Sequence, residues 1–261
     1  MSKPNKEWVF RHFFFAEALD LLHDHFVNLQ INYMPIKGAY LIASNCAGKF
    51  SDRKMVDIDI LVLPKDFSQV IQHFKNVLGV QVKPNYWPFE FSFFFPCKEE
   101  SVFVEIHSLL NYPERFLLPT EDLFSRSISQ KPFCLFPCVE DSLIIFLCHQ
   151  LVHIPFEIRT TVWQETEILS SQEGFSWDKF WELSTHTGVQ QFFNMLLLYY
   201  AKSKKVSVPL HRPSLYSRLL ASIGTRKRFE SMPVWLRRLV LEIPFVKNPL
   251  LLFLKKPWSF L

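Results

Sequence analysis

The sequence predicts a two-part chain of the α+β (α/β) class, a small mixed sheet flanked by helices followed by an all-helical C-terminal domain. Up to about residue 119, segments with the two-residue period of strands alternate with segments of helical period, and beyond it every periodic segment is helical. Hydrophobic residues make up 49% of the 261-residue chain and charged residues 21%, which excludes intrinsic disorder and suffices for a packed core.

The first elements follow from apolar spacing. Apolar side chains recur at helical spacing over residues 7–29, which predicts a long amphipathic helix. The run YMPIKG then reads as a short strand closed by Gly38, and AYLIASNCAG as a helix that ends at Gly48. MVDIDILV is the clearest strand, because β-branched residues alternate with acids.

The helix after this strand has signals at both ends. Pro64 suits its first turn and Gly79 its C-cap. Further strands are expected in QVKPNYW, FEFSFFF and SVFVEIHSLL, the last two joined by the polar turn PCKEE. We therefore place an α/β domain with its N-terminal helix at 1–125, a helical domain at 126–210 and a basic helical extension at 211–261.

Two strands place acids on one face. Alternate residues of a strand point to opposite sides, so Asp57 and Asp59 share a face. The opposite, aliphatic face is expected in the core and carries Val56, Ile58, Ile60 and Val62. SVFVEIHS repeats the pattern, with Glu105 and His107 on its polar side. If the two strands pair, three carboxylates converge on one exposed face.

Converging carboxylates need a compensating cation, because two of them about 4–5 Å apart repel by roughly 3–4 kcal/mol at an effective dielectric constant of 20. Oxygen ligands in this number suit Mg²⁺, and a pair of such ions stabilises an in-line displacement at phosphorus. The alternative is that Asp57 and Asp59 are only the solvent side of an edge strand, since alternating acids are common. Asp57, Asp59 and Glu105 are thus candidate ligands for two Mg²⁺ ions.

The residues upstream favour a phosphate-transfer site. Lys37 and Gly38 end a strand and open a helix, where backbone N–H groups approach a phosphate closely and the lysine adds a charge. Arg53, four residues before Asp57, supplies a second cation.

The stretch PIKGAYLIASNCAGKFSDRKMVDIDILV resembles the uncharacterised nucleotidyltransferase-like family of the DNA polymerase β superfamily. The later VEIH resembles that family's third acid and following histidine, and EDSLIIFLCHQLVHIPF resembles its first C-terminal helix with the pair His149 and His153. Glu165 stands where the family tends to have an aspartate. The superfamily more often has Gly-Ser at the turn where this chain has Lys-Gly. The resemblance covers roughly residues 10–210.

This resemblance implies a nucleotidyltransferase-type fold and a Mg²⁺-dependent enzyme that moves a nucleoside monophosphate from a nucleoside triphosphate to a hydroxyl or phosphate acceptor, releasing pyrophosphate. It implies that Asp57, Asp59 and Glu105 bind the metal and form the catalytic triad. Glu105 is also the group expected to help deprotonate an acceptor hydroxyl. The triphosphate contacts are expected from Lys37, Gly38, Arg53 and His107. The acceptor, whether a small molecule, a protein or RNA, is not specified.

Other functions remain open. The spacing of His149 and His153 is that of zinc-protease ligands, but Gln150 replaces the glutamate base of that motif. The main rival is a non-catalytic nucleotide- or RNA-binding module on the same fold. RNA or another anionic partner is a candidate for the C-terminal end, because residues 201–261 hold 13 Lys and Arg against 2 Glu.

The expected location is cytoplasmic. Five cysteines without a C-x-x-C pair predict reduced, mostly buried thiols. The N-terminus is interrupted by charges and lacks the apolar core of a signal peptide, and no apolar run reaches the roughly 20 residues of a transmembrane helix.

Overall fold

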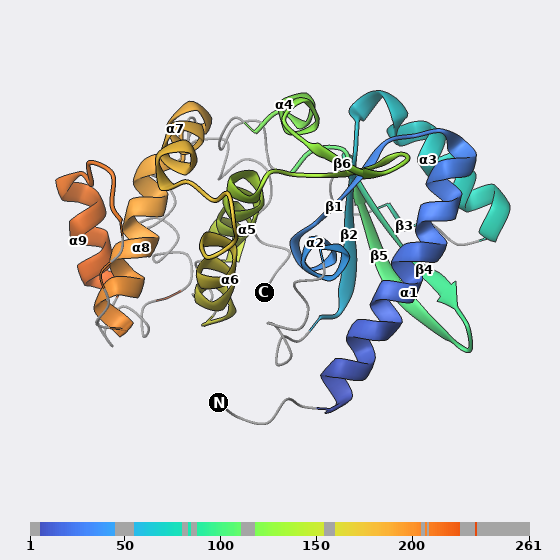
Figure 1. Cartoon of the computed structure of the whole chain (residues 1–261), viewed down its shortest axis with the longest axis horizontal. Coiled ribbons are helices and arrows are strands. Elements are labelled where there is room, and N and C mark those ends of the chain that lie inside the picture. The colour runs from blue at the N-terminus through green and yellow to red at the C-terminus, as the bar shows by residue number, and fades with distance from the viewer. Residues whose placement is uncertain are drawn as a thin grey trace. The chain divides into compact units, whose positions relative to one another are not determined.

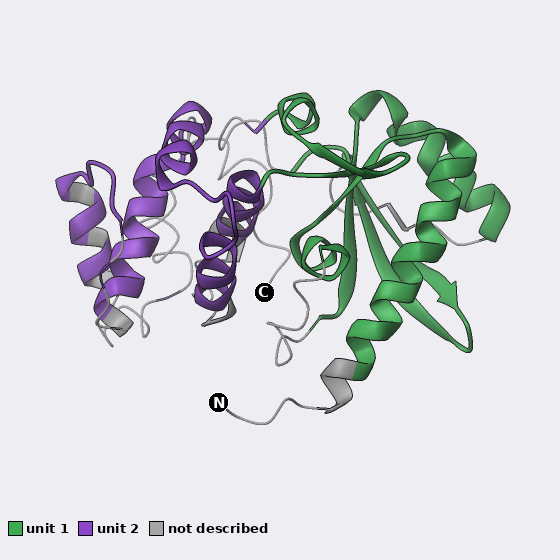
Figure 2. Ribbon diagram, viewed as in Figure 1, with its two compact units in different colours: residues 1–110, 119–138 green, residues 111–118, 139–261 purple. Residues whose placement is uncertain are grey.

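The structure is a computed structural model that describes residues 6–44, 55–79, 83–84, 88–110, 118–153, 160–204, 207, 209–224 and 233. The chain divides into two compact units (Figure 2). Unit 1 comprises Met1–Leu110 and Pro119–Cys138, and unit 2 comprises Asn111–Leu118 and Val139–Leu261. The described strands all belong to unit 1, and the regular elements described in unit 2 are all helices (Figure 1). The predicted fold class, a mixed sheet with flanking helices followed by a helical region, is confirmed.

Unit 1 is built on a seven-stranded sheet with the order β3-β4-β5-β2-β1-β7-β6. In chain order the strands are β1 (Tyr33–Ile36), β2 (Asp57–Val62), β3 (Lys83–Pro84), β4 (Glu90–Cys97), β5 (Glu100–His107), β6 (Ile128–Lys131) and β7 (Cys134–Phe136). The sheet is mixed, because β2 pairs with β5 and β1 with β7 in parallel, while the remaining pairs are antiparallel.

Four helices accompany this sheet: α1 (Lys6–Leu29), α2 (Lys37–Ala43), α3 (Pro64–Leu78) and α4 (Thr120–Ser125). Helices α1 and α3 cover the aliphatic face, where their aromatic side chains pack on the strands. Phe26 of α1 stacks on Tyr33 with ring centroids 4.4 Å apart, and Phe74 of α3 lies 4.7 Å from Phe93. This layer fixes which face of the sheet is buried, and therefore leaves the acids on the other face.

Helix α3 has the predicted ends. Pro64 lies in its first turn, and Gly79 caps it with a φ of 59°, in the left-handed region that glycine adopts without strain. Helix α2 is shorter than predicted: it ends at Ala43 with Ser44 as its C-cap, not at Gly48. The chain from 45 to 54, which includes Gly48 and Arg53, lies outside the described residues.

The prediction is wrong for one of the expected core residues, Val56. Val56 is 57% exposed, while Ile58, Ile60 and Val62 are fully buried as expected. Strand β2 begins only at Asp57, so its alternation does not extend back to Val56, and Met55 occupies the buried position before the strand. The aliphatic face of β5 is buried as predicted, with Val102, Val104 and Ile106 at 2% exposure or less.

The helical part begins later than predicted. Residues 126–138, expected at the start of the helical domain, contain strands β6 and β7. These strands form a hairpin, and β7 extends the sheet by pairing with β1. Both are short, and neither has an alternating pattern of burial, so periodicity gave no signal for them.

Unit 2 contains α5 (Val139–His153), α6 (Thr160–Ser170), α7 (Trp177–Thr187), α8 (Gln190–Lys204) and α9 (Leu215–Gly224). The Ser176 side chain caps α7 by accepting a hydrogen bond from the Lys179 backbone, and Asn194 holds the backbone of His211 through both of its side-chain polar atoms. None of the described helices has the length and apolarity to cross a bilayer. The basic motifs at 226–228 and 237–238 lie outside the described residues.

Two further features concern burial. The described cysteines, Cys97, Cys134, Cys138 and Cys148, are free and buried as predicted, whereas Cys46 lies outside the described residues.

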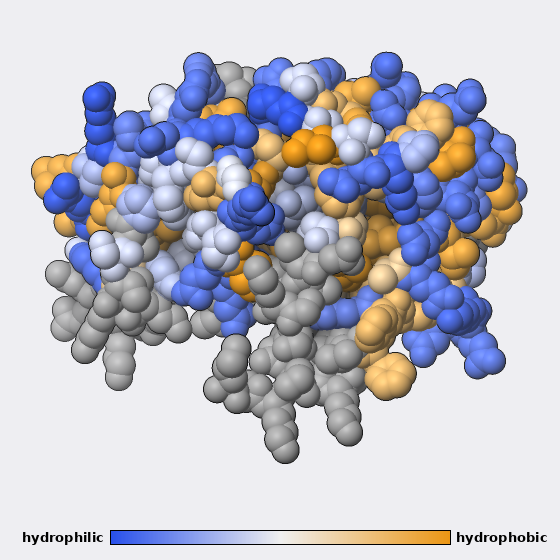
Figure 3. Space-filling model, viewed as in Figure 1, coloured by the Kyte–Doolittle hydropathy of each residue, from blue (hydrophilic) through white to orange (hydrophobic). Residues whose placement is uncertain are grey.

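Figure 3 shows apolar residues over the N-terminal part of α1, where Phe10 and Phe13 are 78% and 73% exposed.

Candidate active site

The acids are brought together by the pairing of β2 with β5. In this parallel pair Asp59 is the register partner of Glu105, Asp57 is the partner of Phe103, and Leu61 is the partner of His107. Register partners point to the same side of a sheet, so the polar face of β2 continues directly into that of β5. The predicted pairing of the two acid-bearing strands is therefore present.

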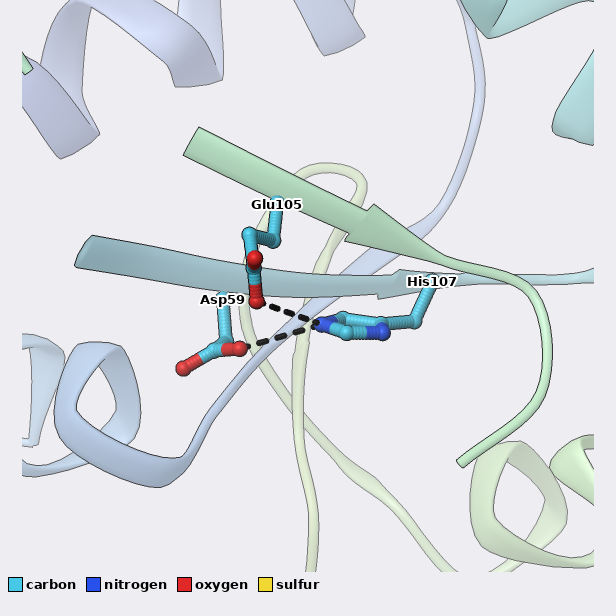
Figure 4. Close-up of side chains that lie close together, drawn as sticks. All are labelled: Asp59, Glu105 and His107. Carbon is cyan, nitrogen blue, oxygen red and sulfur yellow. Dashed lines mark hydrogen bonds and ion pairs between the residues drawn. The ribbon is translucent and has the colours of Figure 1, made fainter. Parts of the chain in front are cut away.

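Three side chains form a tight cluster on this face: Asp59, Glu105 and His107 (Figure 4). One ligand atom from each lies within 4.8 Å of the other two. The Nε2 atom of His107 is 3.0 Å from Oδ1 of Asp59 and 3.8 Å from Oε2 of Glu105. The cluster can thus bring two carboxylates and one imidazole to a single point.

Lys37 reaches the same aspartate from β1. Ile36, the last residue of β1, is the register partner of Asp59, and Lys37 follows it as the first residue of α2. The Nζ atom of Lys37 donates a hydrogen bond of 2.6 Å to Oδ1 of Asp59. Lys37 has a φ of 50°, in the left-handed region, where a residue with a side chain is under strain. The abrupt turn from β1 into α2 therefore places the ammonium beside the carboxylate.

The charges around Asp59 hold it ionised. Burial would raise the pKa of this carboxyl, but the Lys37 ammonium and the His107 ring outweigh burial and bring the pKa well below its usual range. Burial likewise opposes the charge of Lys37, and the adjacent Asp59 carboxylate reverses this, so the pKa of Lys37 is raised. Asp59 and Lys37 therefore form a buried ion pair.

His107 lies between carboxylates. Its Nε2 atom faces Asp59, and its Nδ1 atom is 3.3 Å from Oε2 of Glu90. Burial lowers the pKa of the ring, but the hydrogen bonds to Asp59 and Glu90 more than offset this and raise it to about 9. At neutral pH both ring nitrogens carry protons, so His107 is a cation in this arrangement.

The pKa of Glu105 is shifted in the opposite direction to that of Asp59. Burial and the neighbouring Asp59 carboxylate raise the pKa of Glu105 to about 7. A carboxyl with this pKa exchanges its proton near neutral pH, as a general acid or base must. The surroundings therefore lower the pKa of Asp59 and raise the pKa of Glu105, although the two acids are register partners on neighbouring strands.

This geometry corrects one expectation. The face was predicted to be exposed, but Asp59 is 3% exposed and His107 is 5% exposed. The chain itself supplies two compensating cations, Lys37 and His107, so the acid cluster is partly neutralised by the protein.

A comparison with protein families matches residues 2–203 to the family described as uncharacterised nucleotidyltransferases. The chain belongs to this nucleotidyltransferase family. A search of the curated proteins finds no match. Among solved structures, the solution structure of the antibiotic-resistance factor ANT(2'')-Ia is similar at 10% sequence identity, covering 73% of this chain and 97% of that chain with a TM-score of 0.42.

The other predicted site residues lie as follows. Asp57 is half-buried on the acid face but is not part of the tight cluster, and Gly38 is buried in the first turn of α2. Arg53 and the side chain of His153 lie outside the described residues. His149 is half-buried in α5.

Two polar residues of β4 belong to the same face and were not predicted. Glu90 and Ser92 are the register partners of His107 and Glu105. Glu90 contacts the His107 ring, and Ser92 is 4% exposed. Their spacing in FEFSFFF is the same two-residue alternation that identified the acids, but a single acid and a serine among phenylalanines did not stand out.

The donor set fits a divalent cation of the Mg²⁺ type. Asp59 and Glu105 offer carboxylate oxygens from adjacent strands, and Asp57 lies two residues from Asp59 on the same face. The protonated ring of His107 has no lone pair to offer, so in this state it compensates charge and does not act as a ligand. Asp59 and Glu105, with Asp57 on the same face, are thus the carboxylates that could hold a metal ion.

Proposed function

We propose that this protein is a Mg²⁺-dependent nucleotidyltransferase that transfers a nucleoside monophosphate from a nucleoside triphosphate to a hydroxyl or phosphate acceptor. The acceptor oxygen forms a bond to the α-phosphorus while the bond from that phosphorus to the bridging oxygen breaks. Pyrophosphate leaves with the electron pair of the broken bond. Family membership supports a nucleotidyl transfer, and the composition of the site supports this reaction in particular.

The single observation that carries the proposal is the register of β2 against β5. It places Asp59 opposite Glu105 and leaves Asp57 on the same face. Mg²⁺ bound by these carboxylates supplies neutralisation of the triphosphate charge. Glu105 faces the Asp59 carboxylate at close range, and a bound cation would offset the repulsion between these two acids.

The phosphate-binding role is assigned to Lys37 and Gly38. The backbone at the start of α2 presents N–H groups that lack partners within the helix, and Gly38 has no side chain to block a close approach. The Lys37 ammonium binds an anionic oxygen of Asp59, and its proposed role is to bind a triphosphate oxygen in the same way. Arg53 and His107 are proposed as further contacts with the phosphates.

Glu105 is assigned the role of general base. Its carboxylate lies on the acid face opposite Asp59, where an acceptor hydroxyl next to the metal would be within reach of it. Asp59 does not suit this role, because Lys37 and His107 hold its pKa low. For a phosphate acceptor, which carries no proton on the attacking oxygen, the base is not required.

A second candidate is a non-catalytic nucleotide- or RNA-binding module on the same fold. The observation that favours it is the neutralisation of Asp59 by Lys37 and His107, which stabilises the acid cluster without a metal. A module that only binds a nucleotide or RNA releases no pyrophosphate, whereas the enzyme does. Turnover therefore decides between them.

The test is to incubate the full chain with Mg²⁺, each α-³²P-labelled nucleoside triphosphate and a cell extract, and to follow both pyrophosphate release and the labelled product. We expect release that requires Mg²⁺ and that falls at least about 100-fold in Asp57→Asn, a loss typical of a group that stabilises transition-state charge. Glu100→Gln is the matched control, because Glu100 is an exposed acid of the same strand as Glu105, outside the cluster.

Nucleotide binding without any pyrophosphate release would favour the non-catalytic module. Release that is equal in Asp57→Asn, Glu105→Gln and the wild-type chain would show that the acid cluster is not the active site.

A further inference from the structure

Two phenylalanines lie beside the acid cluster on the polar face of the sheet. Phe94 of β4 and Phe103 of β5 are register partners with ring centroids 5.3 Å apart. Phe94 is 57% exposed and Phe103 is half-buried. The other phenylalanines of β4, Phe91, Phe93 and Phe95, are 2% exposed on the opposite face. The hydrophobic core therefore does not account for the exposed pair.

The pair borders the acids directly. Phe103 is the register partner of Asp57, and Glu105 follows it two residues later on the same side of β5. Register partners have Cβ atoms about 5 Å apart, and residues i and i+2 of a strand about 7 Å apart. A molecule that reacts at the carboxylates can therefore also contact the rings of Phe94 and Phe103.

The pair lies on the opposite flank of the acids from Lys37. The sheet order β4-β5-β2-β1 puts Phe94 and Phe103 on one side of β2, while Lys37 follows β1 on the other side. In an in-line displacement the entering and leaving oxygens stand on opposite sides of the phosphorus. If Lys37 and Gly38 hold the leaving pyrophosphate, the acceptor enters over β5 and β4. This step rests on the function proposed above.

We infer that Phe94 and Phe103 form the floor of the acceptor site and select an acceptor that presents a ring face, such as a nucleoside or glycoside, next to its hydroxyl group. An aromatic side chain binds such a ring by stacking against its face. A chain alcohol has no ring face and gains little from this surface. The competing role is structural, because cross-strand aromatic pairs also stabilise hairpins.

The test uses Phe94→Thr and Phe103→Thr, which keep a residue that favours strands while removing the ring. Ile128→Thr is the matched control, since Ile128 is 58% exposed on β6, a strand at the far edge of the sheet. Affinity for the Mg²⁺–nucleoside triphosphate is measured by calorimetry. Adenosine, phenyl β-D-glucoside and glycerol are then added to the nucleotide complex of protein with ¹³C-labelled phenylalanine.

We expect nucleotide affinity within about twofold of wild type in both variants, and a tenfold or greater loss of label transfer from nucleotide to the acceptor in cell extract, unchanged in Ile128→Thr. Adenosine or phenyl glucoside should shift the ring resonances of Phe94 and Phe103, and glycerol should not. Loss of nucleotide affinity in the variants would overturn the inference, by showing that the rings hold the nucleotide base.

Wild-type binding of nucleotide without any ring shift, together with full label transfer in both variants, would reduce the pair to a hairpin contact and overturn this inference alone. A wild-type chain that does not bind the Mg²⁺–nucleotide would overturn the proposed function, and this inference with it.

Discussion

Asp59 and Glu105 stand opposite each other in register on parallel strands, yet their carboxyl groups have pKa values displaced in opposite directions. The difference arises from the neighbours, because Asp59 accepts hydrogen bonds from Lys37 and His107 while Glu105 lies 3.8 Å from His107 and faces the Asp59 charge. The surroundings therefore favour the ionised form of Asp59 and the protonated form of Glu105.

Removing the two charges should have opposite effects on stability in metal-free buffer. Asp59→Asn leaves Lys37 and His107 buried without their carboxylate partner, and we expect a loss of about 3–5 kcal/mol in the free energy of unfolding. Glu105→Gln relieves repulsion from Asp59 and burial of a charge, and we expect a gain of about 1–2 kcal/mol at pH 8. Urea denaturation with a chelator present measures both.

The gain from Glu105→Gln should depend on pH. The folded-state pKa of Glu105 is raised from 4.5 to about 7, so the folded chain favours the protonated carboxyl. Its stabilising contribution is complete below pH 4.5 and is lost as the pH rises through about 7. The glutamine variant should thus match the wild-type chain at pH 4.5 and exceed it at pH 8. Equal stability at pH 8, or a loss there, would contradict the assigned environment of Glu105.

Glu90 should control the charge of His107. The carboxylate of Glu90 faces Nδ1 of the ring at 3.3 Å, and this contact is one of the causes that raise the pKa of His107 to about 9. In Glu90→Gln the amide retains a hydrogen-bond acceptor but loses the negative charge, so we expect the His107 pKa to fall by about 1 unit. NMR titration of ring-labelled histidine measures it, with Glu100→Gln as the control. An unchanged His107 pKa would show that Glu90 does not support the imidazolium.

A pair of histidines away from the acid cluster should make the stability of unit 1 fall at acid pH. His25 of α1 and His73 of α3 share a hydrogen bond of 3.0 Å between Nδ1 and Nε2, which requires that one of the two nitrogens lacks a proton. Burial lowers the pKa of both rings, and for His25 the neighbouring His73 adds to the effect. A lowered folded-state pKa means that stability is present above pH 6.5 and is lost as the pH falls.

We therefore expect His73→Gln to reduce the loss of thermal stability between pH 7 and pH 5 relative to the wild-type chain. His186→Gln, which replaces an exposed histidine of α7, serves as the control and should leave that loss unchanged. An identical pH profile for His73→Gln and the wild-type chain would contradict this account of the pair.

The sequence was sufficient to predict the acid face, because alternation in 57–62 and 102–107 assigns side chains to faces without knowledge of the fold. It did not predict the Lys37–Asp59 ion pair, since the direction of the Lys37 side chain depends on the left-handed turn between β1 and α2. Glu90 and the pair Phe94–Phe103 also escaped notice, because their importance arises only from the register of β4 on β5. Long-range pairing is the information that periodicity lacks.

The central claim is that the carboxylates of β2 and β5 bind Mg²⁺ beneath a triphosphate. Titration calorimetry of nucleoside triphosphates, with and without Mg²⁺, tests it in the wild-type chain, Asp57→Asn and Glu100→Gln. Asp57 is preferred to Asp59 for this purpose because it lies outside the tight cluster, so its replacement leaves the Lys37–Asp59 pair in place. We expect Mg²⁺-dependent binding that is weakened at least tenfold in Asp57→Asn and kept in Glu100→Gln. Equal affinity in all three proteins, or binding that ignores Mg²⁺, would contradict the account.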